Sequence, residues 1–229
     1  MPGLDAVVFD FDGTLADVPL DFMLMKRKIA ALGEVFLGER PTPDDTPALE
    51  WLAQLVDRVM AVDEAEGKEF RTRGRLAIAA MELDAARTGT LFEFTRPTLT
   101  ELRRRGIGIG IVTRNISAAV RAVFPDVDGL VDVLIPREEA AVVKPHPDHL
   151  LAALKRLGAR PEHSLMVGDH PMDVQTGINA GTLTAGVTTG RMAAADFLPL
   201  SPTYLVPNVA ELMVRLDADG LLKRERAEG

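Results

Sequence analysis

Residues 6–15 read AVVFDFDGTL, an apolar run that ends directly on two aspartates separated by one residue. The run before Asp10 does not alternate with polar residues, which is typical of a strand buried on both faces of a parallel sheet. Gly13 follows the second aspartate and favours a tight turn. The pattern therefore predicts a buried strand whose carboxyl end presents Asp10 and Asp12 from one turn.

Similar runs recur farther along the chain, with helical patterns between them; they occupy residues 107–112, 131–135, 164–167, 182–187 and, more weakly, 204–206. Alternation of strands and helices predicts a parallel sheet with helices on both faces, a doubly wound α/β fold. Ligands of such sheets bind at the carboxyl ends of the strands. The residues that directly follow each run are therefore the candidates for a functional site.

The segment 18–92 has a different pattern, because its apolar residues recur at three- and four-residue intervals and it contains no convincing strand. We predict a smaller, all-helical domain there, inserted after the first strand. The α/β core would then comprise residues 1–17 and 93–229. The charged tail, residues 223–229, is expected to be frayed.

Composition excludes several classes of function. The 229 residues carry 26 Lys and Arg against 34 Asp and Glu, a formal charge of −8, which argues against binding to a nucleic-acid backbone. The chain has no cysteine, so disulfides, thiolate metal sites and cysteine nucleophiles are excluded. No apolar segment is long enough to span a membrane, and the first residues lack the pattern of a signal peptide. We expect a cytoplasmic protein; its oligomeric state stays open.

Polar side chains follow the later strands in a regular way. Thr113 and Arg114 come after the second run, and Lys144 follows the third across a short connection. Asp169 comes directly after the fourth run, and Asp173 follows four residues later. Because the carboxyl ends of parallel strands share one edge of the sheet, these side chains are expected to meet the aspartate pair of the first strand.

In this order the motifs resemble those of the haloacid dehalogenase superfamily, in its phosphatase branch. The similar segments are DFDGTL at residues 10–15, Thr113, Lys144-Pro145, and Gly168-Asp169 with Asp173. The resemblance implies a Rossmann-like core and makes the helical insertion the family's cap domain, as in phosphoglycolate phosphatase-like members.

The resemblance also implies roles for the first group of residues. Asp10 would be the nucleophile that forms an aspartyl phosphate, and Asp12 the general acid and base. A cluster of carboxylates repels a phosphate unless a hard cation lies between them. The implied cofactor is Mg²⁺, with Asp10, the main-chain carbonyl of Asp12, and Asp169 as its ligands.

Three further residues would bind the phosphoryl group or support the binding. Thr113 offers a hydroxyl and a nearby amide, and Lys144 offers a positive charge that also holds the nucleophile. Arg114 stands where the family often has asparagine, and is either a phosphate ligand or an ion-paired arginine at the rim. Asp173 would not bind the metal directly. It would orient Lys144 or a metal-bound water.

The implied function is a Mg²⁺-dependent phosphomonoester hydrolase that acts on a small phosphorylated metabolite. Two alternatives stay open: a phosphosugar mutase on the same scaffold, and a non-catalytic phosphate-binding or signalling protein. The sequence does not identify the substrate.

Two weaker features complete the set of candidates. His146 and His149 are predicted to form a surface cluster at the start of a helix rather than a metal site. Lys68, Arg71 and Arg75 share one helix face by their spacing. They could meet a second anionic group of the substrate or form an ordinary solvated face.

Overall fold

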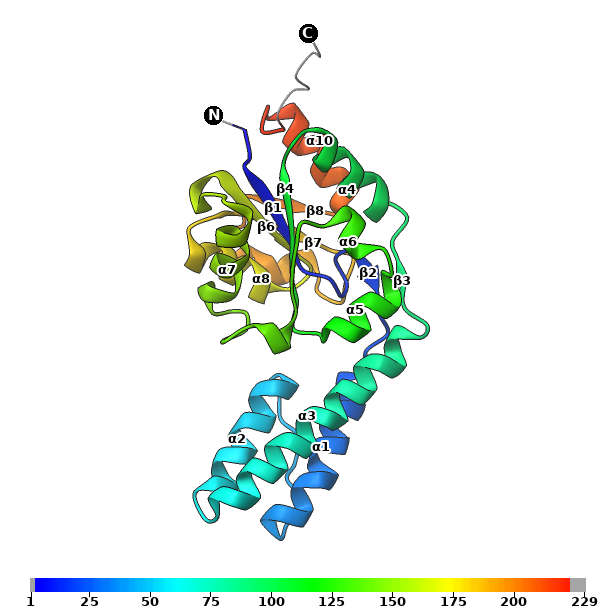
Figure 1. Ribbon diagram of the computed structural model, residues 1–229. Helices are drawn as coiled ribbons and strands as arrows, with labels where there is room; N and C mark the ends of the chain where they lie inside the picture. Colours follow the sequence, from blue (N-terminus) through cyan, green and yellow to red (C-terminus); the bar gives the residue numbers. More distant parts are fainter. Residues whose placement is uncertain (1–2, 223–229) are drawn as a thin grey trace. The chain divides into compact units, whose positions relative to one another are not determined.

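The computed structural model describes residues 3–222, so the tail at 223–229 lies outside the described residues. The chain divides into two compact units. One contains the chain up to Val18 and from Gly89 onward, and the other comprises Pro19–Thr88. The larger unit contains the sheet and the smaller one is helical (Figure 1).

The sheet of the larger unit has six strands in the order β5-β4-β1-β6-β7-β8, and every neighbouring pair is parallel. The strands are β1 (Ala6–Phe9), β4 (Gly108–Val112), β5 (Val133–Ile135), β6 (Ser164–Gly168), β7 (Leu183–Val187) and β8 (Tyr204–Val206). In β1 all four residues are buried, as expected of a central strand covered on both faces.

Helices cover both faces of this sheet (Figure 1). On one face α7 (Pro147–Leu157) packs against β1, β4 and β5, and α8 (Pro171–Ala180) packs against β6 and β7. The other face carries α4 (Thr95–Arg104), which packs on β4, and α10 (Val209–Ala218), which packs on β8. The shorter helices are α5 (Ser117–Val123), α6 (Val127–Leu130) and α9 (Ala194–Phe197). The predicted doubly wound α/β fold is confirmed.

A dense apolar cluster lies between the sheet and α7. It joins residues of four neighbouring strands to the buried face of the helix, namely Val8, Val112, Ile135, Met166, Leu150 and Leu154. Close packing of this kind fixes the strand ends relative to one another. It therefore also fixes the side chains that follow those strands.

A short two-stranded ladder joins the two segments of the larger unit that flank the helical unit. β2 (Ala16–Asp17) pairs antiparallel with β3 (Thr90–Leu91), with Ala16 opposite Leu91. The Leu15 carbonyl also accepts hydrogen bonds from the Phe92 amide at 3.1 Å and the Thr95 hydroxyl at 2.5 Å. The two segments flanking Pro19–Thr88 are therefore held side by side.

The smaller unit contains α1 (Phe22–Leu37), α2 (Ala48–Met60) and α3 (Glu64–Ala86). Asp21 and Asp63 cap the first and third of these helices, because their carboxylates accept main-chain N–H groups of the first turn. The rings of Phe36 and Phe70 stack at 5.0 Å between α1 and α3. Gly74 of α3 lies so close to Leu52 of α2 that a Cβ atom would be 2.5 Å from it, so the small residue allows these helices to pack tightly.

Candidate active site

Four neighbouring strands deliver the candidate residues to one edge of the sheet. Asp10 follows β1, Thr113 follows β4 and Asp169 follows β6, while Lys144 lies in the connection from β5 to α7. The main chain at Asp10 is itself tied to the next strand, because its N–H donates to the Val167 carbonyl at 2.8 Å. The strand order thus brings together residues that are far apart in the sequence.

Lys144 lies between two carboxylates. Its Nζ is 2.7 Å from Oδ1 of Asp10 and 2.6 Å from Oδ1 of Asp173. The Lys144 and Asp173 side chains are only 2% exposed, whereas that of Asp10 is 13% exposed. Burial alone would lower the pKa of Lys144, but the charges of Asp10 and Asp173 outweigh burial and raise it. The ammonium therefore stays charged, and Asp10 is the member of the trio that a substrate can reach.

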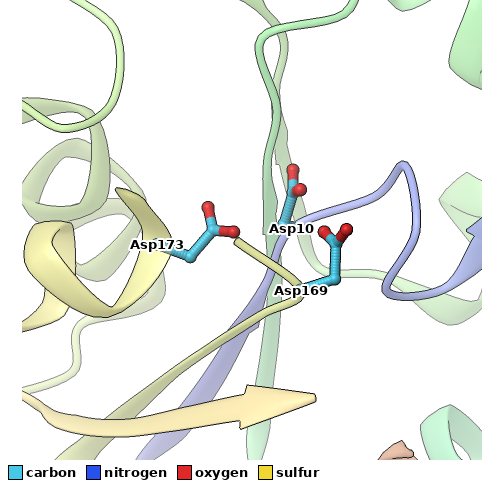
Figure 2. A group of neighbouring side chains, drawn as sticks. All are labelled: Asp10, Asp169 and Asp173. Atoms are coloured by element: carbon cyan, nitrogen blue, oxygen red, sulfur yellow. The ribbon is translucent and has the colours of Figure 1, made fainter. Parts of the chain in front are cut away.

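Three carboxylates gather around this point, as Figure 2 shows for Asp10, Asp169 and Asp173. One ligand oxygen from each lies within 4.8 Å of the others. Burial, followed by the charges of Asp10 and Asp173, raises the pKa of Asp169 to about 8. Burial also raises the pKa of Asp173 to about 6, although Lys144 opposes the shift. Lys144 alone does not neutralise this cluster.

The donor set fits a hard divalent cation such as Mg²⁺, because it consists of carboxylate oxygens with excess negative charge. Asp10 and Asp169 are the better candidates for direct ligands. Asp173 already uses both oxygens, since Oδ1 accepts from Lys144 and Oδ2 accepts the His170 N–H at 3.2 Å. These contacts fit the predicted orienting role of Asp173.

Two glycines allow Asp169 to lie against the turn that follows β1. A Cβ atom on Gly13 would be 2.3 Å from Oδ2 of Asp169, and one on Gly190 would be 1.8 Å from the same oxygen. Gly13 also has a φ of +83°, which side chains rarely adopt. The Thr14 hydroxyl donates to Asp169 Oδ1 at 3.2 Å, and the Thr189 hydroxyl donates to the Gly13 carbonyl at 2.5 Å. The carboxylate is therefore enclosed by main chain on two sides.

Asp12 points to a different set of partners. The Asn115 amide nitrogen is 3.0 Å from its Oδ1 and 3.2 Å from its Oδ2, and the Thr113 hydroxyl is 3.4 Å from Oδ2. The structure thus places Asp12 beside Thr113 rather than in the carboxylate cluster, and the metal role predicted for its main-chain carbonyl stays a prediction. Sequence reasoning did not single out Asn115, although its position two residues after Thr113 was the available signal.

Arg114 reaches toward the start of α8. Its Nη1 lies 2.9 Å from the sulfur of Met172, and its carbonyl accepts a hydrogen bond from Arg137 at 2.7 Å. The predicted phosphate-binding role of Arg114 stays a prediction.

The prediction of a surface histidine cluster was wrong for His149. His146 is exposed, and its ring caps α7 by accepting from the Asp148 N–H at 3.3 Å. His149 is buried, because it lies in the first turn of α7 on the face that packs on the sheet.

Two of the three basic residues singled out on α3, Lys68 and Arg71, contact side chains of their own unit. Lys68 pairs with Glu64 at 2.6 Å, and an Arg71 Nη atom lies 3.4 Å from the Met60 sulfur. Arg75 is exposed. The pairing of Lys68 is typical of a solvated helix face.

Comparison with known proteins identifies the family. The pattern for haloacid dehalogenase-like hydrolases matches residues 4–181, more than half of the chain. The chain belongs to this family of hydrolases. Across the described residues, none of the helices has both the length and the apolar character needed to cross a membrane.

Individual relatives cover nearly the whole chain. Pyrophosphatase PpaX from Bacillus cereus (strain AH820) is 28% identical over 212 residues, which is 92% of this chain and 95% of that protein. The crystal structure of a haloacid dehalogenase-like hydrolase from Bacteroides fragilis aligns with a TM-score of 0.66 at 26% identity, covering 91% of this chain and 99% of that chain. CbbY from Rhodobacter sphaeroides, solved in complex with phosphate, has a TM-score of 0.61 at 21% identity and covers 91% and 96%.

Proposed function

We propose that this protein is a Mg²⁺-dependent phosphomonoester hydrolase that works through an aspartyl phosphate on Asp10. The observation that carries the proposal is the contact between Asp10, which is accessible, and Lys144, which is buried and charged, beside Asp169. A nucleophilic carboxylate held by a buried ammonium next to a cation-binding carboxylate suits attack on a phosphate ester.

In the first half-reaction a carboxylate oxygen of Asp10 attacks phosphorus, and the ester P–O bond breaks. Asp12 donates a proton to the leaving oxygen, so that an alcohol departs. Lys144 and the Thr113 hydroxyl stabilise the phosphoryl oxygens. Asp10, Asp169 and the main-chain carbonyl of Asp12 would hold Mg²⁺, which would supply positive charge to offset that of the carboxylates and the phosphate.

In the second half-reaction Asp12 accepts a proton from a water molecule, whose oxygen attacks phosphorus. The bond between phosphorus and Asp10 breaks, inorganic phosphate leaves, and both aspartates return to their starting states. Asn115 supports this step, because its amide holds the Asp12 carboxylate beside Thr113.

The substrate class is a small phosphorylated metabolite, such as phosphoglycolate. Inorganic pyrophosphate is a second candidate, because the relative that matches 92% of the chain is a pyrophosphatase. With pyrophosphate, Asp12 would protonate a departing phosphate in place of an alcohol. The helical unit would act as the cap that selects the substrate.

The test is a panel of phosphorylated metabolites that includes phosphoglycolate, sugar phosphates and pyrophosphate, scored by phosphate release with Mg²⁺ and with EDTA. We expect Mg²⁺-dependent release from at least one compound. Asp10→Asn should reduce the rate by roughly 10³-fold or more while the melting temperature stays close to that of the wild type. Phosphate release by this variant at the wild-type rate would overturn the nucleophile assignment. Isomer formation from a sugar phosphate without net phosphate release would instead identify a mutase.

A further inference from the structure

His149 is a buried histidine whose two ring nitrogens both contact main chain. Nε2 lies 3.0 Å from the Ile135 carbonyl oxygen, and Nδ1 lies 3.3 Å from the Lys144 nitrogen. A carbonyl oxygen can only accept, so Nε2 carries the proton and Nδ1 accepts the Lys144 N–H. The ring therefore links the end of β5 to the main chain of Lys144.

The same carbonyl extends the link to a third strand. The Thr113 N–H donates to the Ile135 oxygen at 3.2 Å, so this oxygen has two donors. A continuous set of hydrogen bonds thus runs from Thr113 through Ile135 and His149 to Lys144. It connects Thr113 and Lys144, the two residues that stabilise the phosphoryl oxygens in the proposed mechanism. These residues lie in different loops.

The position of the Lys144 main chain matters because its side chain has little freedom. The ammonium is buried and contacts Asp10 at 2.7 Å and Asp173 at 2.6 Å. A displacement of about 1 Å at a site of this kind can cost about 100-fold in rate. Burial, assisted by the nearby Lys144 charge, lowers the pKa of His149 to about 4. The neutral ring keeps Nδ1 as an acceptor.

We propose that His149 is a positioning residue that sets the main chain of Lys144 relative to Thr113, so that both meet the same phosphoryl group. The inference rests on the proposed function, since it concerns the binding of that group. His149 itself does not touch the substrate; it acts through Lys144 and Ile135.

The experiment measures binding of orthovanadate, an analogue of the phosphoryl group in transfer, by calorimetry in the presence of Mg²⁺. For His149→Ala we expect about 10- to 100-fold weaker binding at an unchanged number of sites per chain. A merely structural role would instead reduce the number of sites and leave the affinity of the folded fraction unchanged. His149→Asn, whose amide oxygen replaces the Nδ1 acceptor, should recover part of the affinity.

His146→Ala is the matched control, because it removes a histidine of the same segment. The His146 side chain caps α7 through the Asp148 N–H, whereas His149 contacts Lys144 and Ile135. Its vanadate affinity should equal that of the wild type. If His149→Ala does not fold, His149→Leu fills the volume without the hydrogen bonds and should show the same loss. Failure of both variants to fold, or wild-type affinity in either, would overturn the inference. A wild-type protein that neither binds vanadate nor releases phosphate would overturn the proposed function itself.

Discussion

Asn115 controls where the carboxylate of Asp12 points. Its amide nitrogen contacts both carboxylate oxygens of Asp12, and its own side-chain oxygen accepts the Ile116 N–H at 2.8 Å. The amide is therefore fixed on both sides and only 3% exposed. An acid or base that must reach the leaving oxygen benefits from such a fixed orientation.

We predict that Asn115→Ala lowers kcat by about 10- to 100-fold with little change in KM, because Asp12 loses its anchor but phosphate binding is kept. Steady-state kinetics on the best compound of the panel measures the effect. Gln175→Ala is the control, since that side-chain amide contacts Asn179 rather than Asp12. An unchanged kcat for Asn115→Ala would show that Asp12 does not depend on this contact.

Gly190 permits the position of Asp169, since a Cβ atom there would be 1.8 Å from Oδ2 of Asp169. Gly190→Ala should displace the Asp169 carboxylate. The Mg²⁺ concentration that gives half-maximal activity should then rise by about 10-fold or more. Gly129→Ala is the control, because a Cβ atom on Gly129 meets nothing within 4 Å. Equal Mg²⁺ requirements in the two variants would contradict the argument.

At the scale of single residues, the motif residues could be predicted from the sequence. The residues that hold them in place could not. Asp10, Lys144 and Asp169 follow apolar runs, and their places at the strand ends follow from the strand order. The role of Asn115 depends on a contact with Asp12, which lies 103 positions away in the chain. The role of His149 depends on which way its side chain faces once the helix packs on the sheet, although its partners Lys144 and Ile135 lie only 5 and 14 positions away. A local pattern carries no information on a pair as distant as Asn115 and Asp12. His149 was placed on the surface because a histidine at the start of a helix is usually solvated, whereas here it lies on the face of α7 that packs on the sheet.

Among the helices, α4 and α10 are joined by an ion-pair network. Arg105, at the end of α4, contacts Glu101 and Asp217 at 2.6 Å each. Glu101 also accepts from Arg104 at 2.7 and 2.8 Å. Hydrogen bonds from Arg104 and then Arg105 lower the pKa of Glu101 to about 2.

This lowered pKa predicts a pH-dependent contribution to stability. A carboxyl group whose pKa is lower in the folded than in the unfolded state stabilises the fold above its unfolded pKa, about 4.5, and loses that effect as pH falls toward 2. Because the Glu101 side chain is 33% exposed, solvent screening limits the contribution to about 1 kcal/mol.

We therefore expect Glu101→Gln to lower the free energy of unfolding by about 1 kcal/mol at pH 7 and by progressively less between pH 5 and pH 3. Urea denaturation at each pH gives the difference from wild type. The exposed Glu162, for which the described residues give no ion pair, serves as control through Glu162→Gln. A difference that does not depend on pH would contradict the assignment.

Elements of the sheet were predictable because buried strands leave continuous apolar runs. The run at 131–135 is two residues longer than β5, since Val131 and Asp132 precede the ladder that begins at Val133. β2 and β3 were not predicted. Each has only two residues, which is too short for a periodicity to be visible.

The whole molecule consists of two compact units, one that contains the sheet and one that is helical. Both junctions lie next to the β2–β3 ladder, where Asp17 is opposite Thr90. The larger unit also contains the apolar cluster around α7, to which the smaller unit contributes no residue. The sheet-bearing unit therefore has its own core. At the point where the helical segment is inserted, its chain is held together by the β2–β3 ladder.

We predict that replacing Pro19–Thr88 by a short Gly-Ser linker leaves a protein that unfolds cooperatively on heating, because the ladder already holds the two ends together. Circular dichroism during a thermal ramp measures this. The truncated protein should lose most of its discrimination among the compounds of the panel. Loss of the cooperative transition would show that the core depends on the helical unit.

The β2–β3 ladder also has an evolutionary consequence. A segment that enters and leaves a protein through two adjacent, paired strands can be exchanged for a segment of another length at only two seams, without rebuilding the catalytic framework. New specificities can then arise by recombination or drift in the inserted piece, while the reactive groups are inherited unchanged.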